Sequence, residues 1–115
     1  MTLKLTIWHN PRCSKSRQTL QLLEEHGAEL TVRRYLDDPP SVDELRHALT
    51  LLGIDAAGLV RRKEALFKEL DLKDAADDAL IEAMATHPKL IERPLVLSEG
   101  DAAIGRPPED VLRLL

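Results

Sequence analysis

"LKLTIWHNPRCSKSRQTLQLLEEHG", residues 3–27, changes once from the hydrophobic period of a strand to that of a helix. This change predicts the two elements on which the fold is built. Apolar and polar residues alternate over 3–7 before Trp8 breaks the pattern, and this alternation predicts a strand. From Ser14 to about His26, apolar residues recur at helical spacing, and Gly27 is placed to end the helix. We therefore predict a strand followed by a helix, with the only cysteine of the chain, Cys13, near the start of that helix.

The remaining elements follow the order strand, several helices, two strands and a helix. Ser41 and Glu44 form a capping box ahead of one helix, and "EGD" joins two short apolar runs in the manner of a hairpin. Prolines stand in the first turn of the last predicted helix. We predict strands over 30–36, 93–98 and 102–104. We predict helices over 42–52, within 56–70 and over 77–87, the last of these with Asp77 or Asp78 as its cap. A final helix over 106–115 is predicted to bury Val111, Leu112, Leu114 and Leu115.

This element order predicts an α/β fold with one domain, residues 1–115. A strand, a helix and a second strand at the start suggest a βαβ unit. The helical middle, at about 41–87, contains no strand-like run and no linker flanks it. We interpret it as an insertion into the α/β unit.

Composition narrows the classes of function. The 115 residues carry 16 Lys and Arg against 20 Asp and Glu, a net charge of −4, which disfavours a nucleic-acid backbone as partner. Trp8, Tyr35 and Phe67 are too few aromatic residues for a base-stacking platform. There is no signal-peptide pattern and no run of about 18 apolar residues. We expect a cytoplasmic monomer that binds neither nucleic acid nor membrane, and a single cysteine fits that reducing compartment.

Cys13 has the surroundings of a nucleophile. A thiol at a helix N-terminus faces unpaired N–H groups and the positive end of the helix dipole, and both favour the thiolate. Arg12, Lys15 and Arg17 add three cations nearby, and Asn10 adds a polar group. The loop could therefore hold an oxyanion as well as a thiolate.

His9 and Ser16 are the other polar residues of this loop that we single out. His9 could donate a hydrogen bond to the sulfur or to a bound anion, and Ser16 supplies a hydroxyl beside the N–H groups of the turn. A lone cysteine is often an inert, buried apolar residue. The polar and cationic neighbours of Cys13 favour the reactive interpretation here.

The spacing around Cys13 excludes three other sites. Ser16 stands where a dithiol oxidoreductase has its second cysteine, so the chain has no resolving thiol. Thr19 stands where the loop of thiol phosphatases has arginine. A metal site is not expected, because the histidines are not grouped to complete a ligand set with Cys13.

Three arginines elsewhere are candidates for binding an oxyanion, since a guanidinium suits tetrahedral oxyanions. Arg61 lies in the helical middle, whereas Arg93 and Arg106 each precede a proline. For Arg62 we favour a solvated side chain. The sequence leaves the isomer of the Arg93–Pro94 bond open.

"HNPRCSKSR", "LVRRK", "LIERPLV" and "IGRPPE", between residues 9 and 109, resemble the glutaredoxin-linked arsenate reductase family. The resemblance implies a thioredoxin-like fold, a small mixed sheet flanked by helices with a helical insertion. It implies that Cys13 attacks arsenate, that glutathione is a co-substrate, that glutaredoxin is the protein partner, and that no cofactor is bound. Arg61, Arg93 and Arg106 match the oxyanion-binding arginines of the family, and His9 and Ser16 match residues beside its nucleophile.

Two other functions stay open at this stage. A glutathione-dependent reductase of mixed disulfides would also suit a site with one thiol. The wider family includes Spx-like regulators that bind RNA polymerase, but these usually carry a C-x-x-C switch, which Ser16 interrupts.

Overall fold

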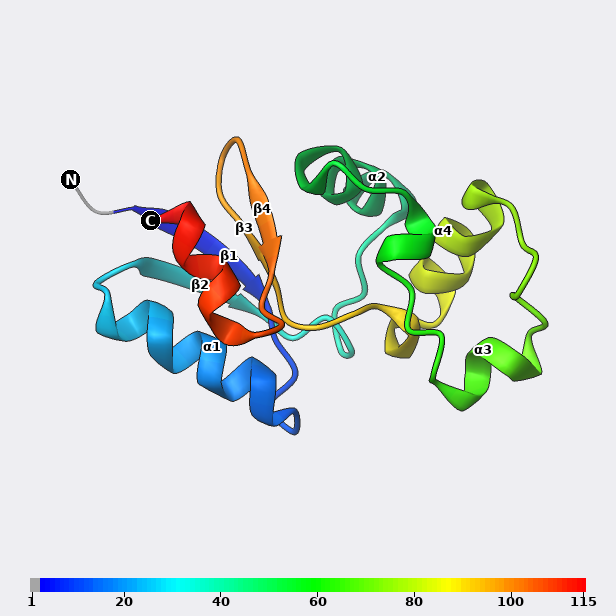
Figure 1. Ribbon diagram of the computed structural model, residues 1–115, viewed down its shortest axis with the longest axis horizontal. Coiled ribbons are helices and arrows are strands. Elements are labelled where there is room, and N and C mark those ends of the chain that lie inside the picture. Colours follow the sequence, from blue (N-terminus) through cyan, green and yellow to red (C-terminus); the bar gives the residue numbers. More distant parts are fainter. Residues whose placement is uncertain (1–2) are drawn as a thin grey trace. The chain divides into compact units, whose positions relative to one another are not determined.

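The computed structural model describes residues 3–115, which fold as two compact units (Figure 1). The first unit consists of the residues up to Asp38 together with Arg93–Leu115, and the second unit is Pro39–Glu92. The chain thus leaves the first unit once and returns to it. The candidate residues around Cys13 belong to the first unit, whereas Arg61 belongs to the second.

The first unit is built on a four-stranded mixed sheet in the order β2-β1-β3-β4. Strand β1 pairs in parallel with β2, while β3 is antiparallel to both β1 and β4. This is the sheet of a thioredoxin-like fold, as the motifs implied. The strands are β1 (Lys4–Trp8), β2 (Glu29–Arg33), β3 (Leu95–Leu97) and β4 (Ala102–Ile104).

Strand β2 is shorter than the predicted range of 30–36. The N–H of His9 donates to the carbonyl oxygen of Arg33 at 2.8 Å, which is the last backbone bond between the two chain segments at this end. The N–H groups of Asp37 and Asp38 then both donate to the carbonyl oxygen of Arg34. This turn uses the backbone groups that a longer strand would need, so β2 ends at Arg33.

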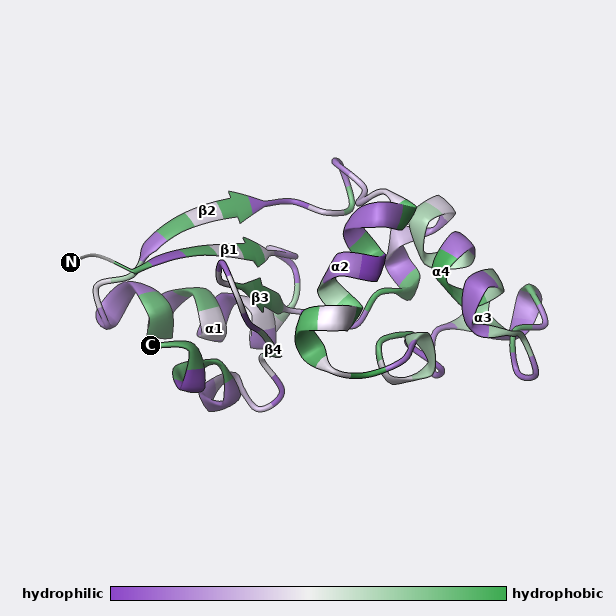
Figure 2. Ribbon diagram, turned by 90° about the horizontal axis from the view of Figure 1, so that it is seen from above, coloured by the Kyte–Doolittle hydropathy of each residue, from purple (hydrophilic) through white to green (hydrophobic). Residues whose placement is uncertain are grey.

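One face of the sheet is covered by α1 (Ser14–Glu25) and by the C-terminal 3₁₀ helix η3 (Pro108–Leu114), which Figure 2 shows on the same side of the strands. The core between them is aliphatic, and burial of such side chains is the main driving force for folding. The cluster consists of Leu5, Ile7, Leu23, Val96, Ala103, Val111 and Leu114.

The last helix differs from the prediction in type and in its buried face. It is a 3₁₀ helix, and the buried residues Pro108, Val111 and Leu114 are three positions apart. A helix with three residues per turn places residues at this spacing on one face. Leu112 is therefore only partly buried, and Leu115 is 46% exposed, contrary to the prediction for both.

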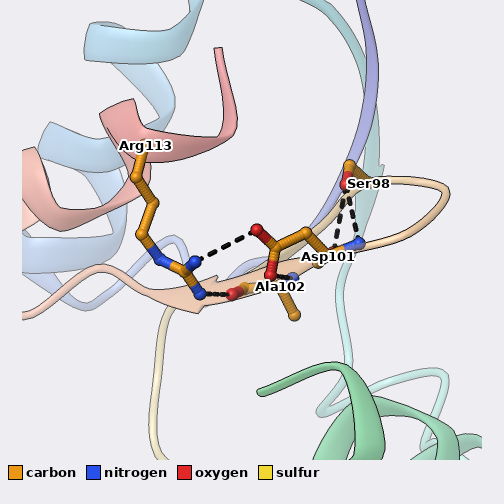
Figure 3. A network of polar contacts seen from close by, with 4 residues as sticks. All are labelled: Ser98, Asp101, Ala102 and Arg113. Atoms are coloured by element: carbon orange, nitrogen blue, oxygen red, sulfur yellow. Dashed lines mark hydrogen bonds and ion pairs between the residues drawn. The ribbon is translucent and has the colours of Figure 1, made fainter. Parts of the chain in front are cut away.

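A polar network fastens η3 to the hairpin of β3 and β4 (Figure 3). Arg113 donates to the carboxylate of Asp101 at 3.0 Å and to the carbonyl oxygen of Ala102. The hydroxyl of Ser98 accepts from the N–H of Asp101 at 3.0 Å and closes the predicted hairpin turn. The C-terminal turn is thus held by hydrogen bonds as well as by apolar packing.

The second unit is helical. Ser41 and Glu44 form the predicted capping box at the start of α2, and Gly53, with φ of 70°, follows its end. The prediction for α4 was wrong in its cap, which is Ala76, because the Asp77 carboxylate accepts instead from the N–H of Ala56 at 2.7 Å. The elements are α2 (Val42–Leu52), η1 (Ala56–Gly58), α3 (Ala65–Glu69), α4 (Asp77–Thr86) and η2 (Pro88–Leu90).

Among residues 3–115, no helix has both the length and the apolar character that crossing a membrane requires.

Candidate active site

Cys13 is the N-cap residue of α1, with extended backbone angles of φ −95° and ψ 123°. The residues from His9 to Arg12 form a tight connection after β1, in which the N–H of Cys13 donates to the carbonyl oxygen of Asn10 at 3.0 Å. The carbonyl oxygen of Cys13 accepts the first helical bond, from Arg17. The thiol therefore lies, as predicted, at the positive end of the helix, and it is partly buried.

The surroundings of Cys13 favour its thiolate. Partial burial raises the pKa of the thiol, but this effect is outweighed by the backbone N–H of Ser16, by the charge of Arg93, by the backbone N–H of Lys15 and by a hydrogen bond from Arg93. The net result is a pKa below the ordinary value, in the direction that the sequence indicated. Nucleophilic attack requires the thiolate, so the site is suited to it.

Arg93 and Arg106 both approach the sulfur. They precede prolines across cis peptide bonds, which settles the isomer that the sequence left open. The Nε of Arg106 donates to the carbonyl oxygen of Arg93 at 2.8 Å, and one of its terminal nitrogens lies 3.9 Å from the sulfur of Cys13. Two guanidinium groups beside a thiolate are suited to hold an oxyanion against it.

Gly105 was missed by sequence reasoning, although it fixes the approach of these arginines. An added Cβ would lie 2.5 Å from the hydroxyl oxygen of Thr19 and 2.8 Å from Cγ of Pro94. Its N–H also donates to the carbonyl oxygen of Pro94 at 2.9 Å. Only a glycine lets the chain pass this close to α1, and a glycine between an apolar strand and Arg106 was the available signal.

His9 and Ser16 form a buried pair. Nδ1 of His9 lies 2.7 Å from the hydroxyl oxygen of Ser16, which also accepts from the N–H of Asn10 at 3.0 Å. Burial, followed by the charges of Arg34 and Arg17, lowers the pKa of His9. The imidazole is therefore neutral near pH 7, and its Nδ1 binds Ser16. This pair holds the loop that leads to Cys13.

Asn10 and Arg17 hold the same loop. The side-chain oxygen of Asn10 accepts from the N–H of Arg12 at 3.0 Å, and Arg17 donates to the carbonyl oxygen of Pro11 at 2.8 Å. The cation that lowers the pKa of Cys13 is Arg93. Sequence reasoning had instead assigned this effect to the cations of the loop, Arg12, Lys15 and Arg17.

Arg61 lies in the second unit and has partners there. It forms an ion pair with Glu64 at 3.3 Å and donates to the carbonyl oxygen of Lys89 at 3.2 Å. The structure thus brings seven of the eight candidate residues together in the first unit, and the oxyanion-binding role of Arg61 stays a prediction. The seven are His9, Asn10, Cys13, Ser16, Arg17, Arg93 and Arg106.

Within the part of the chain that the structure describes, no three His, Cys, Asp or Glu side chains are grouped closely enough to hold a metal ion.

Comparison with known proteins places the chain among relatives of one family. The model of the ArsC family matches residues 8–114. An arsenate reductase of Neisseria meningitidis serogroup B is 49% identical over 115 residues, which cover 97% of this chain and 98% of the relative. A protein of Escherichia coli K12 named only as uncharacterized protein YfgD is 52% identical over 118 residues, covering 100% and 99% of the two chains.

Among solved structures, the arsenate reductase from Vibrio cholerae superposes with a TM-score of 0.97. It is 51% identical to this chain, and the match covers 100% of both.

Proposed function

Because the chain belongs to the ArsC family, we propose that it reduces arsenate to arsenite, with Cys13 as nucleophile and with glutathione and glutaredoxin as external thiols. The observation that carries this proposal is the position of Cys13, a thiol of lowered pKa at the start of α1 with Arg93 and Arg106 beside it.

The reaction needs two electrons, which two external thiols supply. The thiolate of Cys13 forms a sulfur–arsenic bond with arsenate, and an arsenic-bound oxygen leaves as water. Glutathione then forms a second sulfur–arsenic bond, and another water leaves. A glutaredoxin thiolate attacks the sulfur of glutathione, so that the electron pair of its bond to arsenic passes to arsenic and As(V) becomes As(III). Water then releases arsenite and restores the Cys13 thiol.

The side chains of the first unit support the first step. The backbone N–H groups at the start of α1 and the guanidinium of Arg93 hold the thiolate ready for attack. Arg93 and Arg106 also offer charge to the oxygens of the incoming oxyanion, where positive groups stabilise developing negative charge. The neutral pair of His9 and Ser16 keeps the loop in place while this occurs.

The test is a coupled assay that follows NADPH oxidation with glutathione, a glutaredoxin and glutathione reductase, with and without arsenate. We expect arsenate-dependent turnover in the wild type and none above background in Cys13→Ser. Absence of turnover in the wild type with every partner present would refute the proposal, and so would normal turnover in the variant.

The same assay separates arsenate reduction from a general reductase of mixed disulfides. A glutathionylated peptide replaces arsenate as substrate in a parallel series. We expect Arg106→Gln to reduce arsenate turnover by about 10²-fold, the usual effect of removing one donor to a developing oxyanion. Its effect on disulfide reduction should be several times smaller, since that reaction develops no tetrahedral oxyanion. Equal losses in both reactions would favour the disulfide reductase.

A further inference from the structure

A pocket of about 270 Å³ lies between the loop after β1 and the turn after β2. Residues 9–12 form one side, and Arg34, Leu36 and Asp37 form the other. The bond from the N–H of His9 to the carbonyl oxygen of Arg33 joins these two segments. Cys13 follows the first segment directly, so the pocket adjoins the backbone that carries the thiol. Its volume is near the lower limit of small-ligand pockets, which suits one small ligand or one end of a larger one.

The pocket carries an excess of positive charge. Arg12 and Arg34 contribute two guanidinium groups, and Asp37 contributes one carboxylate. Arg34 acts on the interior as well, because its charge is one of the causes that lower the pKa of His9, after burial. An excess of one positive charge favours a ligand with more carboxylates than ammonium groups.

These cations are available for binding, in contrast to their neighbour. Arg33 stacks over Trp8, 5.8 Å from the ring centre, and forms an ion pair with Asp38 at 3.3 Å. Within residues 3–115, the structure records no ion pair for Arg12 or Arg34. The arginine at 33 thus has a structural role, while the arginine at 34 presents its charge to the pocket.

Asn10 offers a directed polar group on the side of the pocket across from Arg34. Its side-chain oxygen already accepts from the N–H of Arg12. The NH₂ group of the same amide remains as a donor, and Leu36 supplies an apolar wall. The pocket thus combines two cations, an amide donor, one acid and an apolar surface.

We propose that this pocket binds the carboxylate-bearing end of the small thiol that reacts at Cys13. This inference rests on the proposed function, in which that thiol is glutathione. Glutathione carries two carboxylates and one ammonium group, which match the two guanidinium groups and the single carboxylate of the pocket. A tripeptide held beside residues 9–12 lies next to the chain segment that leads to Cys13.

The test uses a reaction that involves no arsenate. The Cys13 thiolate attacks one sulfur of oxidised glutathione, so that a mixed disulfide forms on Cys13 and one glutathione thiolate leaves. The rate is compared with that for 2-hydroxyethyl disulfide, which undergoes the same exchange but has no charged group. We expect Arg34→Gln to slow the exchange with oxidised glutathione by 5- to 10-fold and to change the exchange with the neutral disulfide by less than 2-fold.

Matched variants separate binding in the pocket from a general loss of charge. Arg33→Gln removes the same charge one residue away and should leave the ratio of the two rates within 2-fold of the wild type. Arg34→Lys should recover part of the loss. S-methylglutathione, which cannot exchange, should bind the wild type in calorimetry and bind Arg34→Gln at least 5-fold more weakly.

The outcomes distinguish this inference from the proposed function. A selective loss in Arg34→Gln supports the pocket even if the protein fails to reduce arsenate. Equal rates of both exchanges in Arg34→Gln and the wild type would overturn it even if arsenate is reduced normally. A raised KM for arsenate in Arg34→Gln, with unchanged exchange, would overturn it as well, because the pocket would then serve the oxyanion.

Discussion

Helix α2 begins at a fully capped N-terminus, whereas α1 begins at Cys13. In α2, the hydroxyl of Ser41 accepts from the N–H of Glu44, the Glu44 carboxylate accepts in return, and Asp43 adds a second acid to the first turn. In α1, no side chain makes a capping hydrogen bond and no acid stands in the first turn. The positive end of α2 is therefore neutralised for stability, and that of α1 is left for an anion.

This difference leaves the N–H groups at the start of α1 without the side-chain partners that those of α2 have. Substitution of Ser, Thr, Asp or Asn at an N-cap by a residue without a capping side chain typically lowers stability by about 1 kcal/mol. We infer that α1 is less stable for want of a capping side chain. In return, the N–H groups of Lys15 and Ser16 are directed at the sulfur of Cys13.

Removal of the cation beside Cys13 should change the properties of the α1 start more than any other substitution. Arg93→Met keeps an unbranched side chain but removes both the charge and the hydrogen bond that lower the pKa of Cys13. We expect the pKa of Cys13 to rise and arsenate turnover to fall by about 10²-fold. The coupled assay measures this, and Arg93→Lys should restore part of the activity. Unchanged turnover in Arg93→Met would show that the start of α1 suffices alone.

An acid in the first turn of α1, like those in the first turn of α2, should make the start of α1 more stable and less able to bind an anion. Ser14 is exposed in the first turn of α1, so Ser14→Glu should stabilise the helix by about 0.5 kcal/mol. The new charge opposes both the thiolate and an incoming oxyanion, so we expect a higher pKa of Cys13 and a KM for arsenate raised by about 5-fold. Thermal unfolding and steady-state kinetics measure the two effects. A variant that gains stability without loss of affinity would contradict the trade-off.

Removing the cap of α2 should have the opposite signature. Ser41→Ala leaves the N–H of Glu44 without its partner, and we expect the free energy of unfolding to fall by about 1 kcal/mol. The alkylation rate of Cys13 at fixed pH should stay within 2-fold of the wild type under native conditions. Denaturant unfolding and a thiol assay on the same sample check both statements. A large change in thiol reactivity would mean that the two helix starts are coupled.

The smallest effect concerns His9. Its pKa in the folded protein is below the ordinary 6.5, so the unfolded chain binds more protons between the two values. The free energy of unfolding should therefore fall as pH drops below about 6.5, and level off below the folded-state pKa. In His9→Asn this contribution to the slope should be absent. Unfolding curves at several pH values between 7 and 5 test this, and identical slopes for both proteins would refute the role of burial.

Local signals in the sequence predicted the features that depend on neighbouring residues. The capping box at Ser41 and Glu44, the hairpin turn after Ser98 and the thiol at the start of α1 all follow from residues within a few positions of one another. Such patterns act through short-range hydrogen bonds and chain geometry, and these do not require knowledge of the fold.

Features that depend on distant residues were missed or misjudged. Asp77 was expected to cap α4 but accepts from Ala56, 21 positions away. Arg93 lowers the pKa of Cys13 across 80 positions of sequence, while sequence reasoning favoured the nearby cations. Gly105 and Arg34 gain their roles only from the chain segments that the sheet brings beside them. Tertiary packing, which local patterns do not encode, decides all of these.

The most direct measurement is the rate of alkylation of Cys13 by iodoacetamide as a function of pH, with Arg93→Met and Ser41→Ala in parallel. The single cysteine makes the signal unambiguous. The account predicts an apparent pKa below that of glutathione measured in the same way, a higher value in Arg93→Met and an unchanged value in Ser41→Ala. A wild-type curve that coincides with that of glutathione would contradict the claim that the start of α1 and Arg93 hold a thiolate.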